Sequence, residues 1–144
     1  MPEIPIEFVS EDVDFTLEDV DKVKDWIVQV ITDHQFRLEN ITYIFCSDEY
    51  LYNINQTYLN HDTFTDIITF DNSDEEDTVE SDIFISIDRV KENALQLNIP
   101  FTDELHRVII HGVLHLIGYD DKDESSKVKM RQKENDYLSL RDFN

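Results

Sequence analysis

Residues 105–117 constrain the fold more than any other part of the chain. At 100° per residue along a helix, their apolar side chains fall into two groups on opposite sides. A helix that is apolar on two faces is covered on both, so this segment predicts a central helix. One group consists of Leu105, Val108, Ile109, Gly112 and Leu116, and the other of Ile110, Leu114 and Ile117.

A polar wedge runs between these two apolar faces. It consists of Glu104, Arg107, His111 and His115. Because unpaired polar groups are costly to bury, a polar wedge on a central helix needs partners. An ion and a water-filled cleft would supply them. His106 points to a different face, and we interpret it as a structural or surface residue.

His111 and His115 are four residues apart, so on a helix they share one face and can grip a single ion. Gly118 follows at a position where helices commonly end in a left-handed turn. The chain can then double back and bring Asp121, or alternatively Asp120, to the same ion. Two imidazoles and a carboxylate fit a catalytic zinc site with its fourth position open to water.

The spacing matches the zinc-protease motif H-E-x-x-H-x-x-G-x-x-H with two differences. Gly112 replaces the general-base glutamate, and Asp121 replaces the third histidine. Without a base beside the first ligand, a peptidase mechanism lacks its proton acceptor. The pattern therefore indicates a metal site with another chemistry.

Hydrophobic periodicity predicts one domain, residues 1–144, with four strands and five helices. The expected strands cover residues 4–9, 41–46, 66–70 and 82–87. The expected helices cover residues 16–33, 47–60, 88–98, 102–117 and 125–140, with Thr16, Ser47, Asp88 and Thr102 as helix caps. The acidic segment 72–80 lacks apolar anchors, and we expect a mobile loop there.

The net charge of −21 is concentrated in the first part of the chain. Residues 1–88 hold 23 acidic residues against three basic ones, and residues 89–144 hold ten against nine. Long-range attraction to nucleic acid is not expected, since phosphate binding depends on Lys and Arg. A role on RNA would need a local basic surface in the second half of the chain. The candidates for this surface are Arg89, Lys91, Arg107, Lys122, Lys127, Lys129, Arg131 and Lys133. For the group from Lys127 to Lys133, the alternative is the solvated face of an ordinary helix.

Composition also indicates where the protein works. No apolar run approaches the length of a membrane span. The first twenty residues carry seven acids and no Lys or Arg, unlike a secretory signal or a transit peptide. Cys46 is the only cysteine and lies in an apolar run, which predicts a buried thiol. We therefore expect a cytoplasmic protein that does not bind membranes.

The segment from His111 to Asp121 resembles the signature of the YbeY family of bacterial rRNA-maturation endoribonucleases, H-G-x-L-H-L-x-G-Y-D-H. Only its terminal histidine differs, as Asp121. Residues 55–70 resemble the family's N-x-x-Y-R-x-x-D-x-P-T-D-V-L-S-F, and residues 81–86 its G-D-I-x-I-S strand. The tail around Met130, Arg131 and Glu134 also fits. The resemblance covers about residues 50–138.

The resemblance implies a single α+β domain, with a small mixed four-stranded sheet packed against about five helices. It implies one zinc ion, no small-molecule cofactor and cleavage of single-stranded RNA. It also implies maturation of the 3′ end of the small-subunit rRNA, with the rRNA precursor and the small ribosomal subunit as partners, and a role in ribosome quality control. The chain departs from the family at Leu59, where an arginine is typical, so the charge would have to come from Arg107 or His61.

The chemistry expected is metal-assisted hydrolysis of a phosphodiester. Asp66, Asp82 and Glu104 are candidates for the general base, although a structural capping or pairing role is favoured for each. Arg107 is the candidate for a phosphate contact, with a salt bridge to a nearby acid as its alternative. Two other hypotheses remain at this point. One is a ribosome-assembly binding factor with a mainly structural metal, and the other an iron oxygenase with two histidines and one carboxylate.

Overall fold

The computed structural model describes residues 4–59, 65–141 and 143, and these form four strands and five helices. This number of elements agrees with the sequence prediction. Their bounds are β1 (Ile6–Ser10), α1 (Val20–Asp33), β2 (Arg37–Cys46), α2 (Asp48–Leu59), β3 (Ile67–Asp71), β4 (Thr78–Ser86), α3 (Ile87–Leu97), α4 (Phe101–Leu116) and α5 (Glu124–Ser139).

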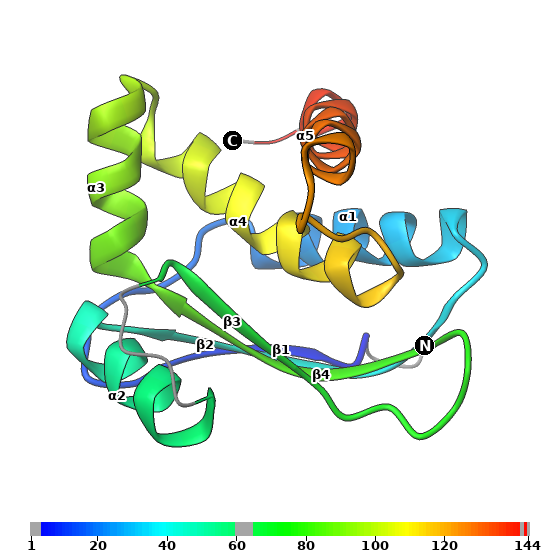
Figure 1. The fold of residues 1–144 in the computed structure, drawn as a ribbon, viewed down its shortest axis with the longest axis horizontal. Coiled ribbons are helices and arrows are strands. Elements are labelled where there is room, and N and C mark those ends of the chain that lie inside the picture. Colours follow the sequence, from blue (N-terminus) through cyan, green and yellow to red (C-terminus); the bar gives the residue numbers. More distant parts are fainter. Residues whose placement is uncertain (1–3, 60–64, 142, 144) are drawn as a thin grey trace.

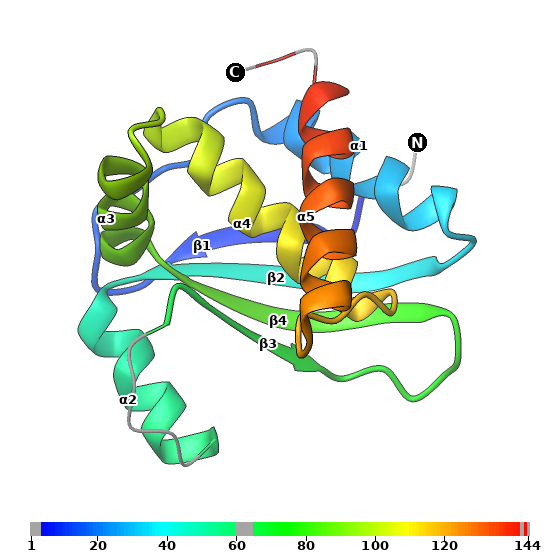
Figure 2. The ribbon, with the colours of Figure 1, turned by 45° about the horizontal axis from the view of Figure 1, so that its top comes forward.

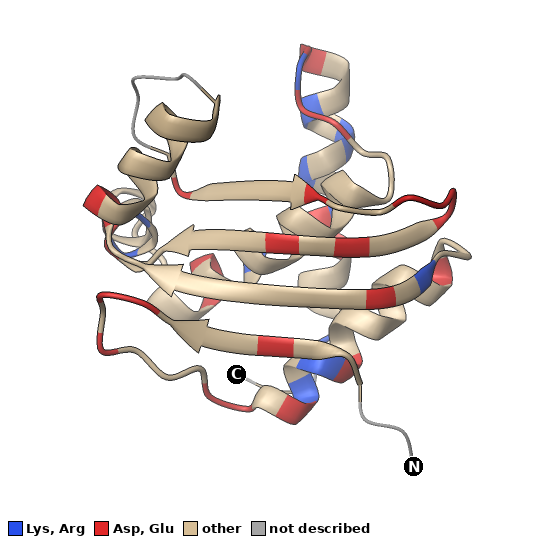
Figure 3. Cartoon of the chain, turned by 90° about the horizontal axis from the view of Figure 1, so that it is seen from below, with Lys and Arg blue, Asp and Glu red and all other residues tan. Residues whose placement is uncertain are grey.

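The four strands form one mixed sheet in the order β1-β2-β4-β3. β1, β2 and β4 run parallel, and β3 pairs antiparallel with β4 at the edge. Figure 3 views this sheet from the side that carries few helices. The α+β class and the mixed four-stranded sheet are therefore confirmed.

α1, α4 and α5 lie on one side of the sheet, and α2 lies on the other side near one end (Figures 1 and 2). α4 passes between the sheet and α5 (Figure 2). Among the described residues, no helix combines the length and apolar character needed to cross a membrane. The prediction that α4 is the central helix is confirmed, because Leu105, Ile109 and Leu114 are all buried.

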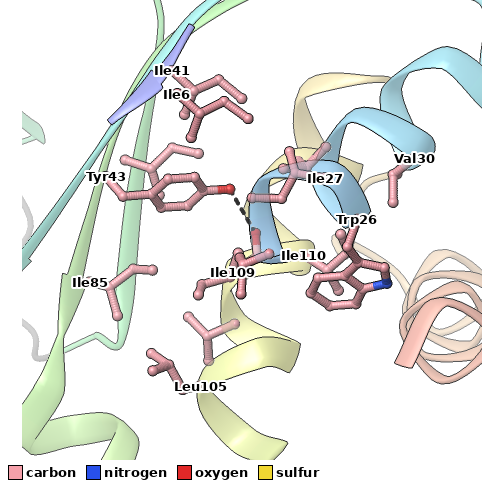
Figure 4. Close-up of a cluster of buried hydrophobic side chains, with 14 of the residues drawn as sticks. Ile6, Trp26, Ile27, Val30, Ile41, Tyr43, Ile85, Leu105, Ile109 and Ile110 are labelled. Atoms are coloured by element: carbon pink, nitrogen blue, oxygen red, sulfur yellow. Dashed lines mark hydrogen bonds between the residues drawn. The ribbon is translucent and has the colours of Figure 1, made fainter. Parts of the chain in front are cut away.

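The main core fills the space between the sheet and α1 and α4 (Figure 4). Alternate residues of β2, such as Ile41 and Tyr43, point into it because side chains of a strand alternate between its faces. The hydroxyl of Tyr43 donates to the carbonyl of Ile109 in α4 at 3.2 Å, as the dashed line in Figure 4 marks. This bond satisfies a buried polar group and fixes α4 against β2. Cys46 is buried on the opposite side, as predicted.

Gly112 lets α4 approach the sheet closely. A Cβ atom at this position would lie 3.0 Å from Cδ1 of Ile67 and 3.3 Å from Cδ1 of Ile83. A side chain at this position would press on the ends of these two isoleucines, which would have to shift by a few tenths of an ångström. The glycine that stands where the protease motif has glutamate therefore lies on the face of α4 that packs against β3 and β4.

Three of the four predicted helix caps are wrong. α1 begins at Val20 rather than at Thr16, after Leu17 has been buried in the core. α4 begins at Phe101 with Pro100 as its cap, ahead of Thr102. Only Ser47 caps as predicted, accepting from the amide of Tyr50 at 3.1 Å.

The cap of α3 is also displaced, since Ser86 accepts from the amide of Arg89 at 3.0 Å. Asp88 instead accepts from the amide of Asp48 at 3.0 Å.

The predicted loop 72–80 is shorter than expected, because β4 already begins at Thr78 and the next residue, Val79, is buried. β4 therefore begins four residues earlier and ends one residue earlier than the predicted strand 82–87.

Candidate metal centre and active site

Two hollows meet at the C-terminal half of α4. The first, of about 360 Å³, lies between α4, α5 and the start of β3. The second, of about 480 Å³, lies between β3, α2 and the end of α4. Both are lined by Asp66, Ile67, His111 and Asp121. These shared residues stand where an elongated ligand crossing both hollows would pass.

His111 is held in one orientation by a carboxylate from the last helix. Its Nδ1 lies 2.7 Å from Oε2 of Glu134, which is buried in α5. Burial by itself lowers the pKa of His111, but the hydrogen bond and the charge of Glu134 outweigh it, so the pKa is raised. Because a carboxylate only accepts, Nδ1 carries the proton, and the ring presents Nε2 to the hollow.

Nε2 of His111 faces Oδ2 of Asp121 at 3.6 Å. Two ligand atoms at about 2.1 Å from one tetrahedral zinc lie roughly 3.4 Å apart, so this spacing fits a shared ion. The helix ends before Gly118, whose φ of 117° lets the chain turn back, as the sequence predicts. The turn brings Asp121 over the end of α4.

His115 lies one turn beyond His111 and lines the second hollow together with His111 and Asp121. Its side chain is exposed, unlike that of His111. Within the described residues, no three side chains of the ligand types stand together as a preformed metal cluster. The three predicted ligands share the lining of the second hollow, and their assignment as one metal-binding set stays a prediction. The donor chemistry, two imidazoles and a carboxylate, fits zinc.

Arg107 is paired with acidic and amide groups rather than free. Its guanidinium donates to Oε1 of Glu134 at 3.0 Å and to Asn135 at 2.9 Å. Burial raises the pKa of Glu134, but the bonds from His111 and Arg107 outweigh it and lower that pKa. Of the two interpretations of Arg107, the structure contains the salt bridge, and the phosphate contact stays a prediction. Lys127 and Arg131 add positive charge to the first hollow.

Asp66 and Glu104 place two carboxyl groups in the first hollow. Burial raises the pKa of Asp66, an effect that the nearby His111 opposes, and Asn93 donates to its Oδ2 at 3.3 Å. Burial, followed by the charge of Asp66, also raises the pKa of Glu104. Oε1 of Glu104 is buried without a hydrogen-bond partner among the described residues. The wedge of Glu104, Arg107 and His111 thus does line a cleft, as its sequence pattern predicts.

Comparison with known proteins identifies the family of this chain. The sequence model of the family described as "Endoribonuclease YbeY" matches residues 6–141. The chain belongs to the YbeY family. The YbeY protein of Cytophaga hutchinsonii is 48% identical over 143 residues, covering 99% of this chain and all of that protein. The one from Flavobacterium psychrophilum is 47% identical over 129 residues, covering 90% of this chain and 91% of its own.

A solved structure shares the fold. The solution structure of TM1509 from Thermotoga maritima superposes with a TM-score of 0.65 and 26% identity. The match covers 93% of this chain and 87% of the other. Both comparisons thus extend over nearly the whole chain, and the YbeY resemblance seen in the sequence motifs is confirmed.

Two departures from the YbeY pattern lie at the hollows. Asp121 stands where the family has its last histidine, and it still faces His111. Leu59, in place of the family's arginine, lines the second hollow at the end of α2. His61, the other proposed source of charge, lies outside the described residues. Asp82 is placed on β4, bonded to Asn72 at 3.4 Å, and does not line either hollow.

Sequence reasoning left Glu134 out of the site. The sequence does contain a sign of its role. Glu134 lies four positions after Met130 and three before Tyr137, so it is an acidic residue on the apolar side of a helix. An acid at such a position needs a buried partner. His106, by contrast, is structural, as one of its two interpretations had it. It is buried, with Nδ1 2.7 Å from Arg141.

Proposed function

We propose that this protein is a zinc-dependent endoribonuclease that hydrolyses single-stranded RNA. One observation carries the proposal: His111, fixed by Glu134, turns its free nitrogen toward Asp121 between two connected hollows. A metal-ligating histidine usually donates its other nitrogen to such a carboxylate. Membership of a family of endoribonucleases supports the RNA substrate.

The residues divide the chemistry between them. His111, His115 and Asp121 would hold the ion, which would supply Lewis-acid activation of the attacking water and of the phosphate. Asp66, which lines both hollows together with His111, would accept a proton from that water. The water oxygen would bond to phosphorus as the bond to the leaving oxygen breaks, and the leaving oxygen would take up the proton that Asp66 has accepted.

The substrate preference follows from the shape and charge of the site. The hollows are large enough for unstacked bases, and a duplex keeps its bases stacked inside. Arg107, Lys127 and Arg131 surround the first hollow and offer positive charge to the phosphates. Glu104 is a second candidate for handling a proton in the same hollow.

The biological setting proposed is that of the family resemblance. The RNA is a precursor of the small-subunit rRNA, cut at its 3′ end, and the small ribosomal subunit is the partner. Roles in ribosome quality control and a cytoplasmic location belong to the same proposal.

The test is cleavage of a short labelled RNA by zinc-loaded protein, with the same sequence supplied as duplex and as DNA. We expect cleavage of the single-stranded RNA alone. Asp66→Asn should slow it about 100-fold without loss of zinc. Asp71→Asn, at the exposed last residue of β3, is the matched control and should change nothing.

Variants of the ligands separate enzyme from contaminant. His115→Ala should remove the metal with only partial loss of fold, and Asp121→Ala should weaken metal binding while Asp121→His preserves it. Cleavage that survives loss of His111, His115 and Asp121 would refute the proposed site. A His115→Ala protein that keeps one zinc per chain would refute the ligand set.

A binding factor with a structural metal is the second candidate. Leu59 at the place of the family's arginine favours it, since the second hollow then lacks that charge. Zinc-loaded protein that binds single-stranded RNA without cutting it, and a Leu59→Arg variant that also fails to cut, would favour this function over the nuclease.

A further inference from the structure

Beyond the buried Ile117, the loop that leads to Asp121 has one half-buried side chain, Tyr119, which packs at the edge of the main core. After α4, the residues Gly118, Asp120, Asp121 and Lys122 are all exposed, whereas Tyr119 is half-buried. The amide of Tyr119 donates to the carbonyl of Leu114 at 3.0 Å and closes the helix end. The position of Asp121 therefore depends on what holds Tyr119.

His34, at the end of α1, makes that contact. Its Nδ1 lies 2.8 Å from the carbonyl of Val30, and its Nε2 lies 3.1 Å from the hydroxyl of Tyr119. Because a carbonyl only accepts, Nδ1 carries the proton, and Nε2 accepts from the tyrosine. The two rings also meet edge-on, with centroids 5.5 Å apart and planes at 88°.

The end of α1 is a firm support for this contact. Val23, Ile27, Val30 and Ile31 bury one face of the helix in the main core. Next to His34, Asp33 accepts from the hydroxyl of Tyr137 in α5 at 3.1 Å. One end of α1 therefore binds both α5, which carries Glu134, and the loop, which carries Asp121.

We infer that His34 is a positioning residue that acts through Tyr119 to hold Asp121 opposite His111. The inference rests on the proposed metal site. It adds to that site a contact between His34 and Tyr119, which are 85 residues apart in sequence. His34 touches neither hollow, since neither is lined by it. The contact orders the loop before the ion binds. Less conformational entropy is then lost on binding, and the affinity for the ion is higher.

Two substitutions at His34 separate this role from simple packing. Asparagine places a polar atom near the position of Nδ1, and glutamine places one near the position of Nε2. His34→Gln therefore keeps an acceptor for Tyr119, and His34→Asn loses it. Tyr119→Phe removes the hydroxyl alone. Tyr137→Phe is the matched control, because it removes a hydroxyl bond of the same length from the same end of α1 and keeps the ring, whose centroid lies 6.2 Å from that of His34.

Zinc affinity is measured by titration with a competing chelator, and the ligand geometry by the visible spectrum of the Co²⁺ form. We expect His34→Asn and Tyr119→Phe to bind zinc about three- to tenfold more weakly, the value of one hydrogen bond. His34→Gln and Tyr137→Phe should stay near wild type. The double variant His34→Asn with Tyr119→Phe should be no weaker than either single variant.

Amide exchange of Tyr119 in the metal-free protein tests the contact without zinc. Exchange should quicken about three- to tenfold in His34→Asn and Tyr119→Phe only. Three results would each overturn the inference. The first is equal exchange in all variants. The others are a His34→Gln protein that binds zinc as weakly as His34→Asn, and a Tyr137→Phe protein that binds zinc as weakly as Tyr119→Phe. If wild-type protein binds no zinc while exchange changes as expected, the metal site fails and the anchoring of the loop stands.

Discussion

Replacing Glu134 by Gln tests how much of the metal affinity depends on the orientation of His111. Both carboxylate oxygens are committed, Oε2 to Nδ1 of His111 at 2.7 Å and Oε1 to Arg107 at 3.0 Å. An amide has only one accepting oxygen, so it turns an N–H toward one of these two donors. Losing such an orienting carboxylate costs about 10- to 100-fold in metal affinity, or about 1.4–2.7 kcal/mol.

The assay is zinc titration of Glu134→Gln beside Glu124→Gln, which changes an exposed residue in the first turn of the same helix. Only the first variant should lose affinity. Urea unfolding of the metal-free proteins should also show a loss of about 1–3 kcal/mol, because Arg107 loses a charged partner. Zinc affinity equal to wild type in Glu134→Gln would show that the buried contact does not prepare His111 for an ion.

Three further predictions concern stability and RNA binding. Burial and the charge of Arg141 lower the pKa of His106 to about 4, so the unfolded chain takes up this proton first as pH falls below 6.5. Wild type should then lose up to about 3 kcal/mol more unfolding free energy between pH 7 and 4 than His106→Asn, measured by urea unfolding at each pH; equal losses would contradict this. Gly118→Ala should cost about 1–3 kcal/mol in the same assay through its φ of 117° alone, as nothing lies within 4 Å of the added Cβ. Single-stranded RNA should bind with a log–log salt slope no steeper than about −2, the value for three cations around the hollow, and a steeper slope would indicate a second basic surface.

The architecture was predictable because hydrophobic periodicity reports burial directly. α4 is the clearest case, since two apolar faces and a polar wedge describe a helix between the sheet and α5 with one edge on a cleft. Helix starts were less predictable, because a cap depends on where the previous element ends. Ser86 is the last residue of β4 and also the cap of α3, so no loop separates them and Asp88 is left to bind α2.

The geometry of the candidate site was predictable where its residues are close in sequence, whereas Asp66 was named as a candidate base without a predicted position and proves to line both hollows. His111, Gly118 and Asp121 follow from helix and turn geometry within one segment. Glu134 and His34 come from α5 and α1, and no local pattern states that these helices end beside α4. Contacts of this kind depend on how three helices pack on the sheet, and this is set by the whole core.

The strong negative charge of the chain is compatible with an RNA substrate because of where the charge lies. Glu7, Glu80 and Asp82 alternate with buried residues, so they belong to the sheet face opposite α4 (Figure 3). Around the first hollow, the three cations Arg107, Lys127 and Arg131 stand against four acids, so the local charge is far closer to zero than that of the whole chain. At physiological ionic strength, charges separated by more than about 8 Å are largely screened from one another. A phosphate in the hollow therefore responds to this nearly balanced local set of charges more than to the net charge of the chain, and the acidic sheet face disfavours RNA bound on that side.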